Sequence, residues 1–466
     1  MNRTIRIVAP YDGANVGSAP LSSEADVENA LSTAHALFKD RSRWLTKIQR
    51  IAILSRAAEL IGERRVDIAR QAAQEGGKPL KDSLTEVDRA IDGLHSCVEV
   101  LRTDSGRVIP MGLNATSSGR VAFTQFEPIG VVVGISAFNH PFNLVVHQVA
   151  PAIAVGAPVI VKPALTTPLS CMALLEAFHD AGLPAAWAQM VLPEANELAT
   201  SLVADHRVGF LSFIGSAAVG WMLRSKLAAG ARCALEHGGA APVIVSDDAD
   251  LDMAIPRIGR GGFWHAGQAC VGVQRVFCHR SIVGEVAARL AAHGESMKTG
   301  DPLLMTTDVG PLISSREVDR VADWVDAAVR GGARIVGGGK RLPGNCYANT
   351  VLLDPPADAE VSRREVFGPV ICVYGYDDLD QAIARANELP YSFQAAVFTR
   401  NIDTAMHCYR QLDGTAVMVN ENTLFRVDWM PFAGARESGL GIGGIANSMR
   451  EMQTEKMMVW RSDALN

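Results

Sequence analysis

The stretch 129-IGVVVGIS-136 decides the fold of this chain. Its residues are apolar and mostly β-branched up to Ser136, so they predict a strand that is buried on both faces. Four more runs of this kind follow, and stretches with helical patterning separate them. Buried strands that alternate with helices are typical of a parallel sheet covered on both faces. The four runs are 158-PVIVKP-163, 189-QMVL-192, 208-VGFLSFIG-215 and 232-RCALEHG-238.

A second series of apolar runs begins at residue 242. We therefore predict an α/β fold with two doubly wound parallel-sheet domains, and we place the seam between them at residues 236–239. The runs of the second series are 242-PVIVS-246, 275-RVFCH-279, 370-VICVYGY-376, 394-QAAVFT-399 and 416-AVMVN-420.

The residues before the first series predict helices and one pair of strands. Ser22 and Ser23 are candidate N-caps for a helix over 24–38, and a long helix that begins near Ile48 is expected to end at Gly76 and Gly77. The segments 106-GRVIPMG-112 and 119-GRVAFTQFEP-128 predict paired strands with a turn between them.

The composition excludes several classes of protein. A chain of 466 residues that is 48% apolar can bury a large core, and its net charge of −6 includes no basic block, so we expect no nucleic-acid or membrane partner. The most apolar stretch, 143–161, contains His147, Gln148 and two prolines, which favours buried core over a membrane span. The eight cysteines form no CxxC pair and no zinc pattern. We expect free thiols, no metal and a cytoplasmic protein without a signal peptide.

Two features point to a cofactor. The segment 211-LSFIGSAAVGWML-223 predicts a strand, a Gly-Ser turn and a helix whose free N-terminus would present N–H groups to a phosphate. An ordinary βα turn has the same pattern. Lys162 closes the strand in 159-VIVKP-163, where its ammonium would reach either the crevice in which such sheets bind ligands or the solvent.

Three further side chains suit acyl chemistry. Asn139, in 136-SAFNHPFN-143, offers a donor for an oxyanion, although a loop Asn often only stabilises a turn. Glu236 ends a strand, where a buried carboxyl has the raised pKa of a general base. Cys270 lies among small residues in 266-AGQACVGVQR-275, so a substrate has room to reach its sulfur; a structural thiol is the alternative.

Seven motifs carry a family resemblance: 127-EPIGVVVGISAFNHPFN-143, 160-IVKPA-164, 213-FIGSAAVG-220, 236-EHGG-239, 267-GQACVGVQR-275, 365-EVFGPV-370 and 431-PFAGARESGLG-441. In their order and spacing, and over essentially the whole chain, they resemble the aldehyde dehydrogenase superfamily. The resemblance implies that Cys270 is the nucleophile, that Asn139 and the Cys270 N–H hold the oxyanion, and that Glu236 activates the water that hydrolyses a thioester. It also implies NAD or NADP as cofactor, bound by Lys162, Gly215, Ser216, Glu365, Phe367, Ser136, Phe138 and Gly238.

This chain departs from the family pattern at positions that bear on the cofactor and the base. The acid that often lies three residues after the strand-end lysine is Leu165 here, so NADP is not repelled and NAD is only slightly favoured. His237 replaces the usual Leu after the base, and we expect it to pack at the seam. The late Gly-x-Glu of the family is replaced near 441-GIGG-444.

The substrate residues expected from the resemblance are Arg89, His140 and Arg426. The subgroup that the chain resembles is that of phosphonoacetaldehyde, lactaldehyde and non-phosphorylating glyceraldehyde-3-phosphate dehydrogenases. Arg89 matches an anion-binding Arg of the relatives that act on phosphorylated or phosphonate aldehydes, and His140 resembles a further anion contact in the phosphonate enzyme. Arg426 lies in the stretch that lines the substrate mouth in relatives. Together these three residues would select a small anionic aldehyde. Surface salt bridges are the alternative, and Ala269 stands where those relatives often have another Arg.

Two other functions stay open at this point: a CoA-acylating dehydrogenase and a non-catalytic scaffold. Glu236 favours hydrolysis over acyl transfer to CoA, and an intact set of Cys270, Asn139 and Glu236 favours an enzyme over a scaffold. By the resemblance, residues 1–105 and 127–236 form an NAD(P)-binding domain and 237–449 a catalytic domain. Residues 106–126 and 450–466 would form a β-strand arm that joins a homodimer or homotetramer.

Overall fold

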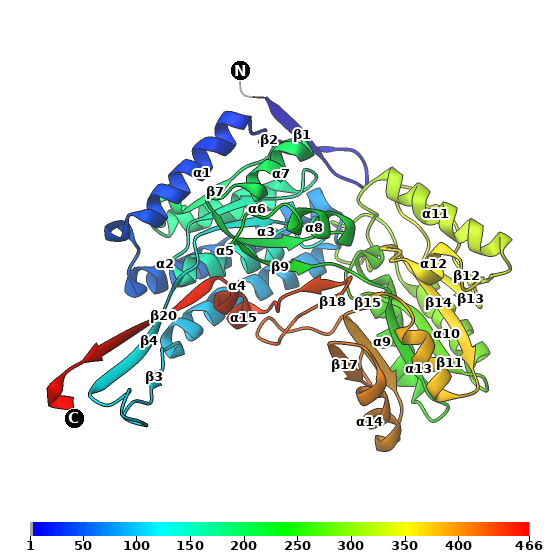
Figure 1. Cartoon of the computed structure of the whole chain (residues 1–466). Coiled ribbons are helices and arrows are strands. Elements are labelled where there is room, and N and C mark those ends of the chain that lie inside the picture. Colours follow the sequence, from blue (N-terminus) through cyan, green and yellow to red (C-terminus); the bar gives the residue numbers. More distant parts are fainter. Residues whose placement is uncertain (1–2, 466) are drawn as a thin grey trace.

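Two helix-covered sheets and a projecting arm of strands make up the computed structural model of the chain, which describes residues 3–465 (Figure 1). The architecture confirms the predicted α/β class with two parallel-sheet units. Residues 1, 2 and 466, at the ends of two predicted ranges, lie outside the described residues.

The first sheet has the strand order β19-β9-β8-β5-β6-β7. Its parallel strands are β5 (Val131–Ile135), β6 (Val159–Lys162), β7 (Ala188–Met190), β8 (Val208–Ile214) and β9 (Arg232–Glu236). The short β19 (Gly439–Leu440), which the sequence reading missed, pairs antiparallel with β9. Ile135 lies beside Lys162 and Phe213 in the register, so these strands end at one common edge.

The helices of the first unit come from two parts of the chain. The strands are connected by α5 (Asn143–Val155), α6 (Pro168–Asp180), α7 (Asn196–Ala204) and α8 (Ala217–Arg224). Before them come the hairpin β1 (Thr4–Val8) and β2 (Asn15–Pro20), then α1 (Glu24–Lys39), α2 (Lys47–Glu63), α3 (Arg65–Gly76) and α4 (Leu80–Thr103). Ser23 caps α1 as predicted. The single long helix expected from near Ile48 is wrong, because Arg64 (φ −104°, ψ 15°) interrupts it between α2 and α3.

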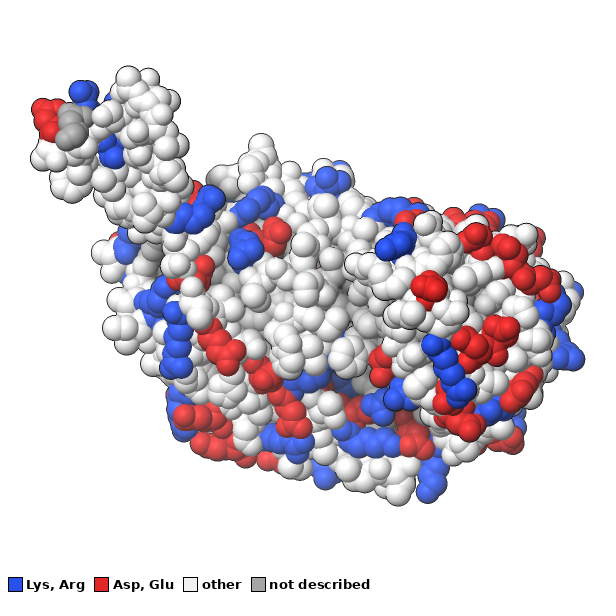
Figure 2. Space-filling view, turned by 90° about the horizontal axis from the view of Figure 1, so that it is seen from below, with Lys and Arg blue, Asp and Glu red and all other residues white. Residues whose placement is uncertain are grey.

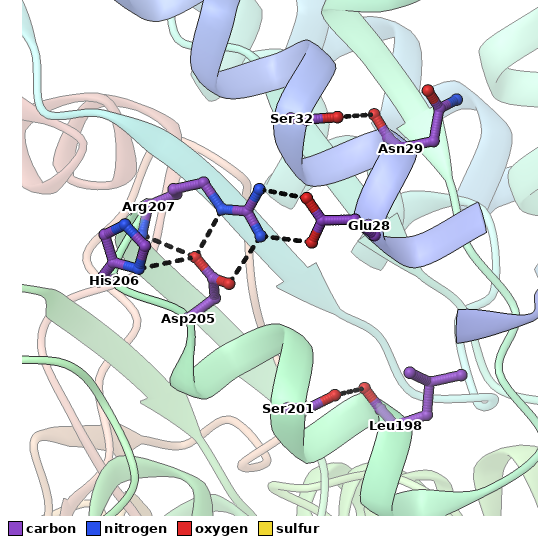
Figure 3. A network of polar contacts seen from close by, with 8 residues as sticks. All are labelled: Glu28, Asn29, Ser32, Leu198, Ser201, Asp205, His206 and Arg207. Carbon is purple, nitrogen blue, oxygen red and sulfur yellow. Dashed lines mark hydrogen bonds and ion pairs between the residues drawn. The ribbon is translucent and has the colours of Figure 1, made fainter. Parts of the chain in front are cut away.

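An arginine ties α1 to the first sheet (Figure 3). Arg207, just before β8, donates to both carboxylate oxygens of Glu28 at 2.7 Å and to those of Asp205 at 2.8 Å. The Arg207 bonds lower the pKa of Asp205 to about 2. Both carboxylates therefore stay charged and hold the helix in place.

The second sheet has the order β12-β13-β14-β11-β10-β16-β17. Its strands are β10 (Ala241–Val245), β11 (Val273–His279), β12 (Arg334–Gly337), β13 (Thr350–Leu353), β14 (Val370–Tyr376), β16 (Gln394–Phe398) and β17 (Ala416–Val419). All pair in parallel except β12, and β12 and β13 were not predicted. Its helices are α9 (Leu251–Phe263), α10 (Val283–Ser296), α11 (Ser315–Arg330), α12 (Glu360–Arg363), α13 (Leu379–Asn387) and α14 (Ile402–Gln411).

The arm projects from the first unit (Figure 1). β4 (Arg120–Pro128) pairs antiparallel with β20 (Gln453–Arg461) along its whole length and with the short β3 (Val108–Ile109) on its other side. The predicted pair of strands is therefore confirmed, with the C-terminal strand as a third member. The helix α15 (Ile445–Glu451) leads into β20. Earlier in the chain, the two-residue strands β15 (Tyr391–Ser392) and β18 (Ala435–Arg436) pair with each other.

The surface of the body carries mixed charges (Figure 2), whereas the most apolar stretch of the chain is buried in the core. Figure 2 shows basic and acidic side chains interspersed over one face of the body, and an arm that is largely uncharged. The apolar stretch 143–161 forms α5 and β6, which are almost entirely buried. Within residues 3–465, no helix has both the length and the apolar character needed to cross a membrane.

Candidate active site

One cavity of about 1200 Å³ is lined from both sheets. It lies at the carboxyl edge of β5, β6, β8 and β9, where open parallel sheets bind ligands. Every residue that the sequence predicted for catalysis, cofactor or substrate lines this cavity, although their roles stay predictions. These residues are Arg89, Ser136, Phe138, Asn139, His140, Lys162, Gly215, Ser216, Glu236, Gly238, Cys270, Glu365, Phe367 and Arg426.

Cys270 follows a tight turn that leads into β11. His265, Ala266 and Gly267 have φ angles of 50°, 54° and 71°, and a side chain on Gly267 would come within 2.0 Å of the Gly368 carbonyl oxygen. Left-handed residues in succession are strained unless the surrounding structure holds them. This turn therefore presents Cys270, which is half-buried, at the cavity wall.

The Cys270 thiol is protonated at neutral pH. Burial raises its pKa to about 12, and the carboxyls of Glu236 and Glu365 act in the same direction, whereas the Arg426 guanidinium opposes them. Its apolar neighbours, Val271 and Phe432 among them, account for the missing solvation. The nucleophile thus needs help to lose its proton.

Asn139 is fixed against the loop of the thiol. Its Nδ2 donates to the Gln268 carbonyl at 2.9 Å, and the residue is buried. The loop that carries Asn139 is held in turn by Glu86, which accepts hydrogen bonds of 2.9 Å from the N–H groups of Phe142 and Asn143 at the start of α5. Buried Lys78 pairs with Glu86, so this carboxylate is compensated.

Glu236 ends β9 beside a glycine. A Cβ on Gly443 would lie 2.3 Å from Oε1 of Glu236, so the missing side chain makes room for the carboxyl. Burial raises the pKa of Glu236, and nearby Arg426 opposes the rise. Gly443 belongs to 441-GIGG-444, where the sequence departs from the family pattern, and the structure shows Glu236 packed on it.

The cavity also has features that fit a dinucleotide. Lys162 has no ion pair within residues 3–465; its Nζ donates only to the Pro163 carbonyl, at 3.3 Å, and burial lowers its pKa. Ser216 is the N-cap of α8 without a side-chain cap, which leaves the N–H groups of that turn for an anion.

The part of the cavity around Glu365 has features that fit a ribose and the nicotinamide ring. The Glu365 carboxyl lies so close to Gly238 that a Cβ there would be 1.6 Å from Oε1, and burial raises the pKa of Glu365 to about 8. Oε1 of Glu365 and Oγ of Ser136 are buried without a hydrogen-bond partner. Phe138 and Phe367 form an aromatic wall with ring centroids 5.8 Å apart.

The substrate residues have different environments. Arg89, on α4, donates to both oxygens of Asp428 at 2.8 and 2.9 Å. Arg426 makes no ion pair within residues 3–465 and lies over the Phe432 ring, 3.6 Å from its centroid. The pKa of half-buried His140 is well below its usual value because of burial and neighbouring cations, so this ring is neutral.

Asp428, the buried partner of Arg89, and His147, a partner of Asp428, do not line the cavity themselves, and sequence reasoning missed both. Asp428 is buried, and its Oδ1 contacts His147 Nε2 at 2.7 Å in addition to Arg89. Because Asp428 follows Arg89 by 339 positions, no spacing rule could have paired them. His237 is buried between Phe213 and Trp221, with Nδ1 2.9 Å from the Glu437 carbonyl oxygen.

Comparisons with known proteins agree with this geometry. The model of the aldehyde dehydrogenase family matches residues 1–458. The 3-sulfolactaldehyde dehydrogenase of Priestia aryabhattai is 35% identical over 456 residues, which are 98% of this chain and 94% of that protein. Among solved structures, aldehyde dehydrogenase 21 from Physcomitrella patens in complex with succinate is 33% identical with a TM-score of 0.94, over 99% of this chain and 95% of that one. A glyceraldehyde-3-phosphate dehydrogenase from Methanocaldococcus jannaschii complexed with NADP is 31% identical with a TM-score of 0.93, over 99% and 100%. The chain therefore belongs to the aldehyde dehydrogenase family and is an enzyme that oxidises aldehydes with a nicotinamide cofactor.

Proposed function

We propose that Cys270, Asn139 and Glu236 carry out the oxidation of a small anionic aldehyde to its acid. The observation that carries this proposal is their convergence on one cavity with Lys162, the α8 N-terminus and Glu365. A scaffold without activity would have no need of a half-buried thiol at the wall of such a cavity.

The first half of the reaction depends on Cys270 and Asn139. The Cys270 thiol gives up its proton to solvent, and the thiolate attacks the carbonyl carbon. The oxyanion that forms accepts hydrogen bonds from Asn139 Nδ2 and the Cys270 N–H. Arg426 favours the thiolate because it lowers the pKa of Cys270. The adduct then loses hydride and becomes a thioester; the nicotinamide ring, when bound, is the group that accepts this hydride.

The second half depends on Glu236. Its raised pKa suits it to take a proton from a water molecule, whose oxygen adds to the thioester carbon and releases the acid and the Cys270 thiol. Hydrolysis distinguishes this enzyme from a CoA-acylating one. The half-buried position of Glu236 at the end of β9, with room made by Gly443, supports that choice.

The cofactor is held by this chain's own residues in the proposed complex. Gly215, Ser216 and the α8 N-terminus would hold the pyrophosphate, and Lys162 and Glu365 would hold the two riboses. Leu165 puts no negative charge near the adenosine ribose, so we propose that both NAD and NADP are accepted, with NAD slightly preferred.

We also propose a cytoplasmic homo-oligomer. All eight cysteines are free thiols, which suits a reducing compartment. The arm leaves β20 as an exposed edge strand with four exposed apolar side chains, Met457 to Trp460, and such an edge favours pairing with another subunit.

An aldehyde panel with NAD and with NADP tests the proposal. We expect formation of reduced cofactor and of the free acid, and no oxidation by Cys270→Ser although this variant still binds the cofactor. An acyl-CoA product that depends on added CoA would overturn the hydrolytic step. Absence of oxidation with every aldehyde would overturn the whole proposal.

A further inference from the structure

Six arginines line the cavity, and five of them face a carboxylate. The pairs are Arg89–Asp428 at 2.8 Å, Arg257–Glu421 at 3.5 Å, Arg260–Asp82 at 3.9 Å, Arg320–Glu317 at 2.8 Å and Arg364–Glu360 at 3.3 Å. Within the part of the chain that the structure describes, Arg426 is the arginine of this cavity without an ion pair. Lys162 is also unpaired, but it lies at the end of β6 on the cofactor side.

Arg426 is placed to meet a ligand that is attached to Cys270. Its guanidinium covers the Phe432 ring, and Phe432 packs with Val271 and Cys270 in one apolar cluster. The Nε of Arg426 is buried and has no hydrogen-bond partner. A half-buried cation with unused donors at this position suits an anionic group of the substrate.

Arg89, in contrast, contributes no net charge to the cavity. The Arg89 guanidinium donates hydrogen bonds to both carboxylate oxygens of Asp428, whose side chain is 1% exposed. The other side-chain partners of the Asp428 carboxylate are the neutral amide of Asn143, at 3.4 Å, and His147. Burial keeps the pKa of His147 below its usual value, so this ring is also neutral. Turning Arg89 toward a substrate would leave the Asp428 carboxylate buried without its cation, which is unfavourable.

We propose that the substrate tail carries a single negative charge held by Arg426, and that Asp428 sets this limit by neutralising Arg89. A carboxylate or a sulfonate satisfies this condition, whereas a doubly ionised phosphate or phosphonate would need a second free cation. The inference rests on the proposed function and names Asp428 as a specificity residue that does not need to touch the substrate.

Three aldehydes of similar length test the charge limit: butyraldehyde, succinic semialdehyde and phosphonoacetaldehyde, compared by kcat/KM at a pH at which the phosphonate is doubly ionised. We expect the semialdehyde to be the best substrate. In Arg426→Gln, the ratio of semialdehyde to butyraldehyde should fall by about 50-fold, the range for the loss of a charged hydrogen-bond donor. Arg426→Lys should retain part of this preference.

Asp428 is tested by a matched pair of variants. Asp428→Asn frees the charge of Arg89, so the ratio of phosphonate to semialdehyde should rise by about tenfold. The double variant Arg89→Gln/Asp428→Asn restores a net charge of zero and should return this ratio to that of the wild type. Thermal unfolding of each variant shows whether it is folded. If Asp428→Asn does not fold, the double variant, in which neither charge is left unpaired, still allows the ratio to be measured.

The outcomes separate the inference from the proposed function. Oxidation of all three aldehydes with no preference for the semialdehyde, or an unchanged ratio in Arg426→Gln, would overturn the charge limit while leaving the enzyme intact. A wild-type preference for the phosphonate would also overturn it. No oxidation of any aldehyde would instead overturn the proposed function.

Discussion

Cys270 is a weak nucleophile in the protein without cofactor, and the reason is local. Small neighbours leave the sulfur accessible, but the surrounding apolar side chains remove the water that would stabilise a thiolate, and Glu236 adds a like charge. The same desolvation that hinders the first step raises the pKa of Glu236 and so helps the last one. Arg426 is the local group that favours the charged form of both.

The titration of Cys270 can be measured by alkylation. Because the pKa is about 12, the thiolate fraction and the rate of modification by iodoacetamide should rise about tenfold per pH unit between about pH 7 and about pH 10. Mass spectrometry of the Cys270 peptide in the cofactor-free protein gives the rate, and Cys270→Ser identifies the signal. A plateau near pH 8.5 would contradict the prediction.

Glu236→Gln separates the two halves of the reaction. We expect thioester hydrolysis to slow by about 100-fold, because a general base is lost, while the first turnover of reduced cofactor is affected much less. Rapid-mixing experiments should show a burst equal to the enzyme concentration and an acylated Cys270. Equal slowing of burst and steady state would mean that Glu236 also acts in the first half.

At the scale of elements, two local structures aim the catalytic groups. The left-handed turn at residues 265–267 positions Cys270 in the loop before β11, and the Lys78–Glu86 pair holds the beginning of α5 next to Asn139. Both are rigid because buried partners hold them, which suits catalytic groups that have to keep a defined geometry.

Gly267→Ala tests the turn. The new Cβ would meet the Gly368 carbonyl at 2.0 Å and would adopt an unfavourable φ of 71°, so we expect a loss of at least ~1 kcal/mol of stability. A lower midpoint of thermal unfolding would show the loss of stability, and a changed alkylation rate of Cys270 would show that the turn positions the thiol. Gly284→Ala on α10 is the matched control, since a Cβ there meets nothing within 4 Å. Equal effects of the two substitutions would contradict the role of the turn.

At the scale of the whole molecule, the arm has one face with little to cover it in a single chain. Val121 and Phe123 of β4 lie opposite Trp460 and Met458 of β20, and all four side chains are at least 38% exposed. The arm is also largely uncharged in Figure 2. An apolar face next to an open strand edge suits burial against another subunit.

The double variant Met458→Glu/Trp460→Lys tests the role of the arm in assembly. The charges should disfavour burial of this face, so we expect a smaller species than the wild type in sedimentation velocity. Ile48→Lys, at an isolated exposed apolar residue (82% exposed), should leave the mass unchanged. A wild-type monomer, or an unchanged assembly in the double variant, would contradict the proposed oligomer.

The sequence was a good guide to most strands that have a local signal, although the buried four-residue strand β13 was missed. Strands such as β5 and β11 are buried on both faces, so their residues are apolar throughout and could be recognised singly. β12 has two exposed and two half-buried residues, and β19 has only two residues, so neither has a pattern to read. The break at Arg64 also leaves no Pro or Gly between α2 and α3 as a signal.

By itself the sequence determined the α/β class, the family and the residues that line the cavity, because strand burial and motif spacing are properties of short segments. Only the tertiary structure decided which charges in that cavity are free. Arg89 and Arg426 are alike as letters, yet one is neutralised by a carboxylate 339 positions away and the other is not. Electrostatic pairing depends on distance and burial in space, and neither quantity exists until the two sheets and the loops between them have come together.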